Sequence, residues 1–425
     1  MSLLLKNAQI VDPEAGTVRD GALLIEKGRI KEAIYQDSPD LEFKDTFDCG
    51  GKYLAPGIID IGVKIGEPGE RHKESFASAG VAAAAGGITT MVIRPDTEPA
   101  VDSPEALEFI NRRAQADGVV NILPMAALTR GRAGHEMAEL GFLLDAGAVA
   151  FSDGDQVITD NKVFARCLTY ARGLDALVIT HAQEPSFSKG AAATSGPLAS
   201  KLGLPAVSPM AERLQLQRDM TLAEMTGVRM HVDQLSTRGA IPVLERAKSK
   251  GLAVTAGASI HHLTLNENDI EGYPTFFKLK PPLRHEDDRV ALADAVASGL
   301  IDIISSMHTP QDEESKRLPF EEAASGAVAL ETLLPAAMQL VHAGLIELPI
   351  LWRALSANPA KLLGLSSGRI AKDAPADLVL FDPDKPFVLD RFTLNSKSKN
   401  TPFDGRRMQG KVLATFLGGK EVYRA

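Results

Sequence analysis

The 425-residue sequence has only two cysteines, Cys49 and Cys167, which form no CxxC pair. No secretory leader is recognised beside them, so a disulfide scaffold is excluded and a reducing cytoplasm is expected. The longest apolar runs, such as 147–151 and 176–180, are far shorter than the ~20 residues that span a bilayer. Basic residues are also few, with 46 Lys and Arg against 55 Asp and Glu. This balance argues against attraction of the whole surface to nucleic acid or to an anionic membrane.

The composition is that of an ordinary globular protein with a large core, with 44% hydrophobic and 24% charged residues. The two ends of the chain share one pattern. Residues 1–54 alternate short apolar runs with turns, and residues 367–425 do the same. Neither end has enough strands for independent stability. We therefore expect 1–54 and 367–425 to pack together as one small β-sandwich domain.

The middle of the chain alternates apolar runs with amphipathic or Ala-rich helical stretches. Eight runs are typical of strands: 58–63, 88–93, 119–127, 148–152, 176–180, 228–232, 252–256 and 301–305. Continuous apolar strands of this kind are expected in a parallel sheet covered on both faces. Eight β-α repeats in ~250 residues match a closed barrel. The sequence predicts an α/β protein with a (β/α)8 TIM barrel and C-terminal helices over 55–366; an open doubly wound sheet is the alternative.

Polar side chains end most of these runs. In such a barrel the active site lies at the C-terminal ends of the strands, so these residues are its candidates. They include Asp60 and Lys64 after the first run, Arg94 and Asp96 after the second, Asp153 and Asp155 after the fourth, His181 after the fifth, Gln234 after the sixth and His308 after the eighth.

A series of short motifs follows in a fixed order along the whole chain. It includes Pro56-Gly57-Ile58-Ile59-Asp60, Glu67-Pro68-Gly69, Phe151-Ser152-Asp153, Pro281-Pro282-Leu283-Arg284 and Ser398-Lys399-Asn400-Thr401-Pro402-Phe403. Together they resemble the amidohydrolase superfamily, specifically class I dihydroorotases. The resemblance implies a metal-dependent barrel with a β-sandwich built from both termini. It also implies reversible cyclisation of carbamoyl aspartate to dihydroorotate by a zinc-bound hydroxide.

The metal positions of that family are mostly changed here. Its Asp-x-His-x-His reads Asp60-Ile61-Gly62-Val63-Lys64, so both imidazoles are absent. Lys64 is a cation with donors only, which opposes a divalent metal. The family's later His falls at Gln234, and its catalytic Asp falls at Met307. Because catalytic zinc usually has three protein ligands, we expect no metal, no other cofactor and no catalytic residue.

The substrate positions differ as well. The family's Arg before Glu67 is Gly66, its Met-Pro-Asn-Thr turn reads Arg94-Pro95-Asp96-Thr97, and its Asn before Pro281 is Lys280. Loss of an Arg that clamps a carboxylate weakens binding of dihydroorotate. The residues expected to line a vestigial pocket are Asp60, Gly62, Lys64, Arg94, Asp96, Asp153, His181, Gln234, Lys280 and His308.

Three residues keep metal-binding chemistry at these strand ends: Asp153, His181 and His308. Asp153 and His181 are the weak candidates for a metal site, and a polar role without metal is the alternative for each. For Lys64 we predict that its ammonium replaces part of the metal charge and pairs with Asp60 or Asp153. A carboxylate buried there without a counter-charge would be costly or would protonate.

The resemblance then implies a catalytically inactive dihydroorotase-like protein of de novo pyrimidine synthesis. It would be a structural subunit for the catalytic chain of aspartate carbamoyltransferase, and a homodimer is the base-rate expectation. The alternative is an active hydrolase of cyclic amides with a rearranged Zn²⁺ site. That site would contain Asp153 and His181, together with His308 or Asp155.

Overall fold

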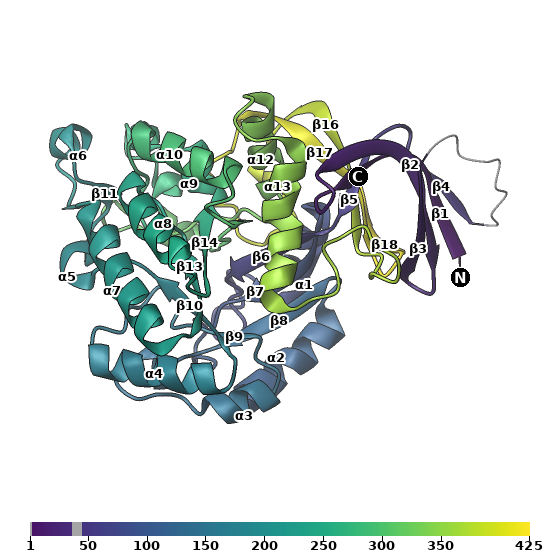
Figure 1. Cartoon of the computed structure of the whole chain (residues 1–425). Helices are drawn as coiled ribbons and strands as arrows, with labels where there is room; N and C mark the ends of the chain where they lie inside the picture. The colour runs from purple at the N-terminus through teal and green to yellow at the C-terminus, as the bar shows by residue number, and fades with distance from the viewer. Residues whose placement is uncertain (1, 36–44) are drawn as a thin grey trace.

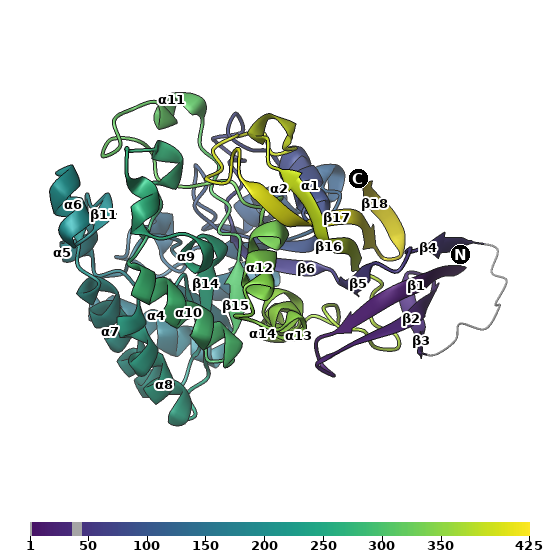
Figure 2. The same cartoon turned by 90° about the horizontal axis from the view of Figure 1, so that it is seen from above.

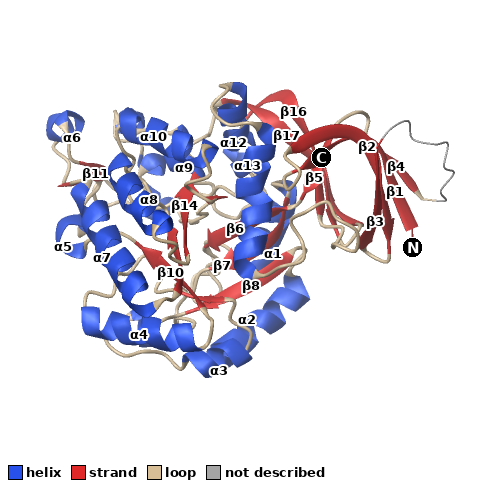
Figure 3. Cartoon of the chain, in the orientation of Figure 1, coloured by secondary structure: helices blue, strands red, loops and turns tan. Residues whose placement is uncertain are grey.

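The computed structural model describes residues 2–35 and 45–425. A barrel surrounded by helices forms the larger part, and a sheet built from both ends of the chain lies at its side (Figure 1). Figure 3 shows the helices on the outside of the barrel strands. In the described part of the chain, no helix is long and apolar enough to cross a membrane.

Eight parallel strands form the barrel. They are β6 (Ile58–Val63), β7 (Ile88–Ile93), β8 (Asn121–Ala126), β9 (Ala150–Phe151), β10 (Leu177–His181), β13 (Arg229–Asp233), β14 (Val254–Ser259) and β15 (Ile303–Ser305). They follow one another in chain order across the sheet, from β6 to β15. β6 and β15 lie next to each other, and Lys64 N donates to His308 O over 2.8 Å just beyond their ends. The predicted barrel is therefore confirmed, nearly closed, and the open doubly wound sheet is wrong.

Helices separate the strands and cover the barrel. They are α1 (Phe76–Ala85), α2 (Pro104–Asp117), α3 (Leu140–Asp145), α4 (Asn161–Gly173), α5 (Pro185–Ser188), α6 (Pro197–Leu202), α7 (Met210–Thr226), α8 (Ile241–Ser249), α9 (Ile260–Thr264), α10 (Glu286–Ala297), α11 (Glu313–Lys316), α12 (Leu333–His342), α13 (Leu348–Trp352) and α14 (Asn358–Leu363). Side-chain hydrogen bonds explain where some of these helices begin. The side chain of Asp160 accepts from Lys162 N and Val163 N at the start of α4, which satisfies two donors that the helix leaves free. A two-stranded sheet of β11 (Ala193–Thr194) and β12 (Ala206–Val207) lies between α5 and α7.

Both ends of the chain contribute to the second sheet. Its strands are β1 (Ser2–Asp12), β2 (Thr17–Glu26), β3 (Arg29–Tyr35), β4 (Thr46–Asp48), β5 (Tyr53–Pro56), β16 (Leu378–Val388), β17 (Arg407–Leu417) and β18 (Lys420–Arg424). β5 lies between β1 and β16 and so joins the two ends, as the view in Figure 2 shows. The predicted domain from both termini is present as one continuous, mostly antiparallel sheet. The exact boundaries, 1–54 with 367–425 and 55–366, stay a prediction.

Trp352 connects this sheet to the barrel. Its Nε1 donates to Pro56 O over 2.8 Å, at the point where β5 leads into β6. Its ring stacks on Phe381 of β16 with centroids 4.6 Å apart. Both rings are fully buried, so the C-terminal helices hold the first barrel strand in place.

Candidate functional site

Arg94 and Asp96 form a buried ion pair at the end of β7. Arg94 Nε lies 3.1 Å from Asp96 Oδ1, and its Nη2 lies 3.0 Å from Asp96 Oδ2. Burial by itself would lower the pKa of Arg94, but the carboxylates of Asp96, Asp155 and Asp233 together raise it. Three strand ends therefore direct carboxylates toward one guanidinium, which marks the centre of the barrel mouth.

Asp155 holds two further cations together beside this centre. Its carboxylate lies 2.8 Å from Lys280 Nζ and 2.9 Å from Arg132 Nη2. Burial opposes the ionised form, but Lys280 and Arg94 outweigh it and hold the pKa of Asp155 well below its usual range. Because two cations share one carboxylate, this side of the mouth favours a bound anion.

His181 and Asp233 face each other across neighbouring strands. They are paired in the register of β10 and β13, and His181 Nδ1 lies 3.2 Å from Asp233 Oδ1. The imidazole side chain is only 2% exposed, and its Nε2 has no partner among the described residues. An ionised carboxylate can only accept a hydrogen bond, so Nδ1 carries the proton and Nε2 keeps a lone pair.

Lys64 does not pair with Asp60 or Asp153, so that prediction is wrong. Its Nζ lies 3.5 Å from Glu70 and 3.5 Å from Asp96. The predicted partners are satisfied elsewhere by local hydrogen bonds, which remove the need for a buried counter-charge.

Hydrogen bonds from hydroxyl and main-chain N–H groups satisfy the carboxylates of Asp60 and Asp153. Asp60 accepts from the main chain and hydroxyl of Ser306, and burial raises its pKa to about 6 against these bonds. Asp153 accepts from Leu128 N, Thr129 N and the Thr129 hydroxyl, and burial is again the main cause of its raised pKa. Both carboxylates are therefore engaged in holding the strand ends together.

His308 contacts the main chain at Ala329 and the carboxylate of Glu74. Its Nδ1 accepts from Ala329 N over 3.1 Å, and its Nε2 lies 3.5 Å from Glu74 Oε2. Both His308 and Glu74 are fully buried. Asp153 and His181 line one small pocket, and His308 is not among its lining residues. The rearranged site of Asp153 and His181 with His308 or Asp155 stays a prediction.

Metal-binding geometry is not met at these strand ends. A Cβ atom on Gly62 would lie 2.7 Å from Met307 Sδ, so a thioether fills the space beside this position. Lys64 brings a positive charge close to Asp96. Across residues 2–35 and 45–425, no three His, Cys, Asp or Glu side chains are grouped so that they could hold a metal. The side chains present therefore do not fit the divalent metal that the family resemblance implies.

The backbone at two of the changed positions is unusual. Gln234 has φ 45° and Met307 has φ 48°, in the left-handed region that side chains other than glycine rarely adopt. Such strain concentrates at functional sites. Both residues are also buried, at 8% and 6% exposure. The strand ends keep a specialised backbone although the side chains have changed.

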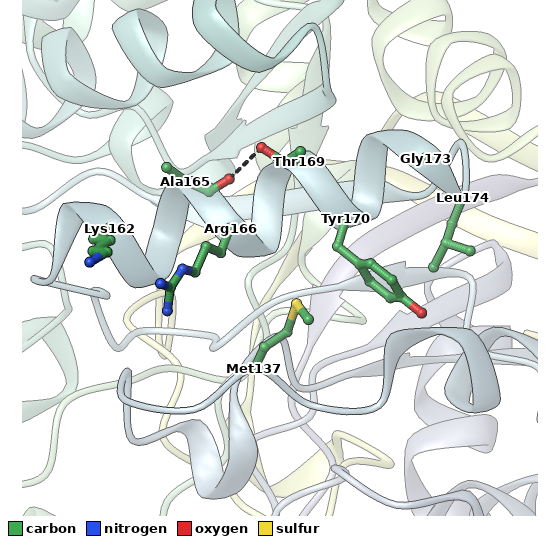
Figure 4. Close-up of a pocket in the computed structure, with 8 residues that line it drawn as sticks. All are labelled: Met137, Lys162, Ala165, Arg166, Thr169, Tyr170, Gly173 and Leu174. Atoms are coloured by element: carbon green, nitrogen blue, oxygen red, sulfur yellow. Dashed lines mark hydrogen bonds between the residues drawn. The ribbon is translucent and has the colours of Figure 1, made fainter.

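A surface cavity of about 730 Å³ lies elsewhere (Figure 4). Met137 and one face of α4, including Arg166 and Tyr170, line it. This face is on the outside of the barrel, so the cavity is not part of the strand-end site.

A family model and several curated proteins match the sequence of this chain. Residues 51–240 match the family model described as "Dihydro-orotase-like". The dihydroorotase of Geobacter metallireducens is 35% identical over 424 residues, covering 100% of both chains. That of Pelobacter propionicus is 36% identical over the same share of both chains. The chain belongs to the dihydroorotase family.

Solved structures extend the comparison to the fold. The L-hydantoinase (dihydropyrimidinase) of Arthrobacter aurescens superposes with a TM-score of 0.90, at 24% identity, covering 99% of this chain and 96% of that one. The dihydropyrimidinase of Brevibacillus agri gives 0.86 at 22% identity, covering 100% and 95%. This chain therefore shares its fold with these two hydantoinase or dihydropyrimidinase structures.

These comparisons correct two expectations. The catalytically inactive structural subunit is contradicted, because relatives that match the chain from end to end are named dihydroorotases. The expectation of no cofactor is contradicted as well. The chain belongs to the dihydroorotase family, and the resemblance to that family implies a metal-dependent reaction. The misfit between that metal and the described side chains is a separate finding, which rests on Gly62, Met307 and Lys64.

Sequence reasoning identified most of the mouth but missed Asp233, Arg132 and Glu70. Asp233 stands at the end of an apolar run, and this position in the sequence could have indicated that it is a site residue. Its pairing with His181 depends on the register between β10 and β13. Glu70 comes from a loop and Arg132 from a three-residue 3-10 turn, Arg130–Arg132. No periodic pattern in the sequence indicates the direction of a side chain in such segments.

Proposed function

We propose that this protein hydrolyses a cyclic amide of the dihydroorotate class, reversibly, at the mouth formed by its barrel strands. The observation that supports this most directly is the 35–36% identity to dihydroorotases over the full length of both chains. In the forward reaction the ring C–N bond breaks, water supplies the oxygen that joins the carbonyl carbon, and the ring nitrogen leaves with a proton.

The chain's own groups for moving that proton are His181 and Asp233. Their 3.2 Å contact orients the imidazole and leaves Nε2 without a protein partner among the described residues. Nε2 can take a proton from water and return it to the leaving nitrogen. A positioned proton carrier of this kind contributes about 10²–10⁴-fold to the rate.

Cations on the other side of the mouth suit the substrate's carboxylate. Lys280 and Arg132 share Asp155, and Lys280 is 44% exposed, so it is free to turn toward a ligand. Arg94 Nε and Nη2 are both bonded to Asp96, and the residue is buried. We assign carboxylate recognition to Lys280 and Arg132 for this reason.

The test is turnover of dihydroorotate by the purified full chain, as isolated and after incubation with Zn²⁺. Hydantoin and dihydrouracil are assayed in parallel as other cyclic amides. We expect turnover above the uncatalysed rate, reduced at least about 100-fold in His181→Asn. His135→Asn, at an exposed position, is the matched control and should keep full activity. Absence of turnover with all three amides in both conditions would overturn the proposal.

Association with the catalytic chain of aspartate carbamoyltransferase rests on the resemblance alone and stays a prediction. The homodimer and the cytoplasmic location stay predictions too. Light scattering on the purified protein, alone and mixed with that catalytic chain, tests both assemblies. A monomer mass in each case would reject them.

A further inference from the structure

A second polar cavity lies beside the loop that follows β15. Its volume is about 170 Å³, and its lining includes Lys316, Arg391, Lys397 and Lys399, with Asp312 and Glu313. Four basic side chains therefore line the cavity together with two carboxylates. The segment 396–403, which carries one of the family motifs, contributes two of the lysines but has no role in the strand-end site.

The lysines of this cavity are bound by main-chain carbonyls. Lys316 Nζ donates to Thr275 O over 3.0 Å and to Ala324 O over 2.6 Å. Lys397 Nζ donates to Arg71 O over 2.9 Å, and Lys399 Nζ donates to Ser396 O over 2.6 Å. Carbonyls carry no net charge, so these contacts orient the ammonium groups without neutralising them.

Lys316 is buried without a carboxylate partner among the described residues. The residue is only 3% exposed. Burial and the nearby charge of Lys278 lower the pKa of Lys316 to about 7. Lys278 itself donates to a carbonyl, Glu321 O, over 2.6 Å. A buried ammonium group normally has a carboxylate partner, so an anion in the cavity would supply the missing negative charge.

The remaining lining fits an oxyanion as well as a charge. Arg391 Nη2 lies 3.5 Å from Glu313, and its Nε lies 3.5 Å from Asp404. The guanidinium lies over the rings of Phe276 and Phe392 at 5.1 and 4.6 Å. A planar donor held in this way is suited to two phosphate oxygens. Since a water occupies about 30 Å³ in the liquid, the cavity has room for one tetrahedral oxyanion with a few waters.

We propose that this cavity binds a phosphate group, either as free phosphate or at the end of a small phosphate monoester such as a nucleotide. Phe392 is 67% exposed beside Arg391, and gives a nucleotide a ring on which its base can stack. The site is independent of the amide hydrolysis proposed above.

The cavity is connected to the end of β15. Asn400 Oδ1 accepts from Gln311 N over 3.1 Å, and Lys397 N donates to Glu74, which faces His308. An anion held by Lys397 and Lys399 would fix the loop that lies against this strand end. The bound state should therefore be more stable than the free one.

Binding is tested by calorimetric titration of the full chain with inorganic phosphate and, separately, with a nucleoside monophosphate, both in dilute buffer. We expect saturable binding with Kd of about 1 mM or tighter for at least one of them. Equal affinities assign the site to free phosphate, and tighter binding of the nucleotide assigns it to a phosphate monoester. No saturation by either compound would overturn the proposal.

Substitutions of the lysines in this cavity test whether phosphate binds there. Lys397→Met combined with Lys399→Met should weaken binding at least about tenfold, and Lys397→Arg should retain it because the charge is kept. Lys420→Met, on the exposed end of β18, is the control for loss of a lysine elsewhere. Since Lys399 also holds its loop, Lys316→Met gives a second variant, in which an apolar side chain of similar length replaces the buried cation. Unchanged affinity in both variants would place the bound phosphate elsewhere and refute this site.

Discussion

Met307 fills the space beside Gly62 at the mouth of the barrel. A Cβ atom on Gly62 would lie 2.7 Å from Met307 Sδ and 3.0 Å from its Cε, much closer than optimally packed heavy atoms approach. The family resemblance places a metal-binding His and the catalytic Asp at these two positions. The two differences from the family are therefore physically coupled, because the thioether takes the volume that a side chain at position 62 needs.

Gly62→Ala should destabilise the protein by about 1–3 kcal/mol, since φ 93° is strained for any side chain and the end of the Met307 side chain must shift. Adding Met307→Ala should recover part of this loss, so that the two changes together cost less than their sum. Denaturant unfolding of the two single variants and the double variant measures the coupling.

The control for this experiment is Gly405→Ala. Gly405 has φ 71°, but nothing lies within 4 Å of its added Cβ, so the substitution tests backbone strain alone. It should cost about 1 kcal/mol. Equal losses in Gly62→Ala and Gly405→Ala would show that Met307 does not crowd position 62.

Glu212 is a buried carboxylate on which the loop after β13 depends. It accepts from the main chain of Ser236 and Thr237 at 2.8–3.1 Å and from Gln183 Nε2 at 3.0 Å. Its charge also acts on the fully buried Arg284. Glu212→Gln should therefore destabilise the protein by about 3–5 kcal/mol, because a buried guanidinium loses a counter-charge. Thermal and denaturant unfolding measure the loss.

Glu224 provides a comparison on the same helix, α7. It pairs with Lys250 over 2.8 Å, but both side chains are nearly half exposed, at 48% and 47%. Glu224→Gln should change stability by less than about 1 kcal/mol. A similar small effect of Glu212→Gln would mean that the buried network is dispensable.

The barrel could be predicted from the sequence because its strands are buried on both faces. β6 and β7 are each buried at all six positions, and such strands appear as continuous apolar runs. Short elements leave no comparable pattern. β11 and β12 have two residues each, and no run of apolar residues identifies them.

The site could be predicted only as far as strand ends reveal it. His181 and Asp155 were predicted at the mouth because they follow strands. His308 also follows a strand, yet its ring lies against Glu74. The backbone just before it, at Met307, has φ 48°, which changes the direction of the following side chain. Left-handed residues other than glycine cannot be predicted from a sequence pattern, so the direction of the His308 ring could not be predicted either.

Asp233→Asn should lower kcat for dihydroorotate by about 10²–10⁴-fold with a smaller change in KM. The amide can donate to Nδ1, which would place the proton on Nε2 and remove the lone pair that accepts it. Steady-state kinetics of both proteins, with circular dichroism to compare their folds, measure the effect. A change confined to KM would assign Asp233 to substrate binding and remove it from proton transfer.

Stability should fall as the solution is acidified, in part because of His261. This imidazole is 2% exposed and stacks on Phe403 with centroids 5.9 Å apart. Burial, with smaller contributions from His262 and His308, lowers its pKa to about 3. In the unfolded chain a histidine titrates near 6.5.

Between those two values the unfolded chain binds a proton that the folded protein does not, so unfolding becomes easier as pH falls from about 6.5 toward 3. One such proton corresponds to a slope of up to about 1.4 kcal/mol per pH unit. His261→Asn should make the free energy of unfolding less steep against pH by this amount between pH 6 and 4, measured by denaturant titrations at several pH values.

Asp60, whose pKa burial raises to about 6, acts in the opposite direction but equally in both proteins. His135→Asn removes an exposed histidine and should leave the slope unchanged, whereas parallel curves for wild type and His261→Asn would show that His261 titrates normally in the folded protein.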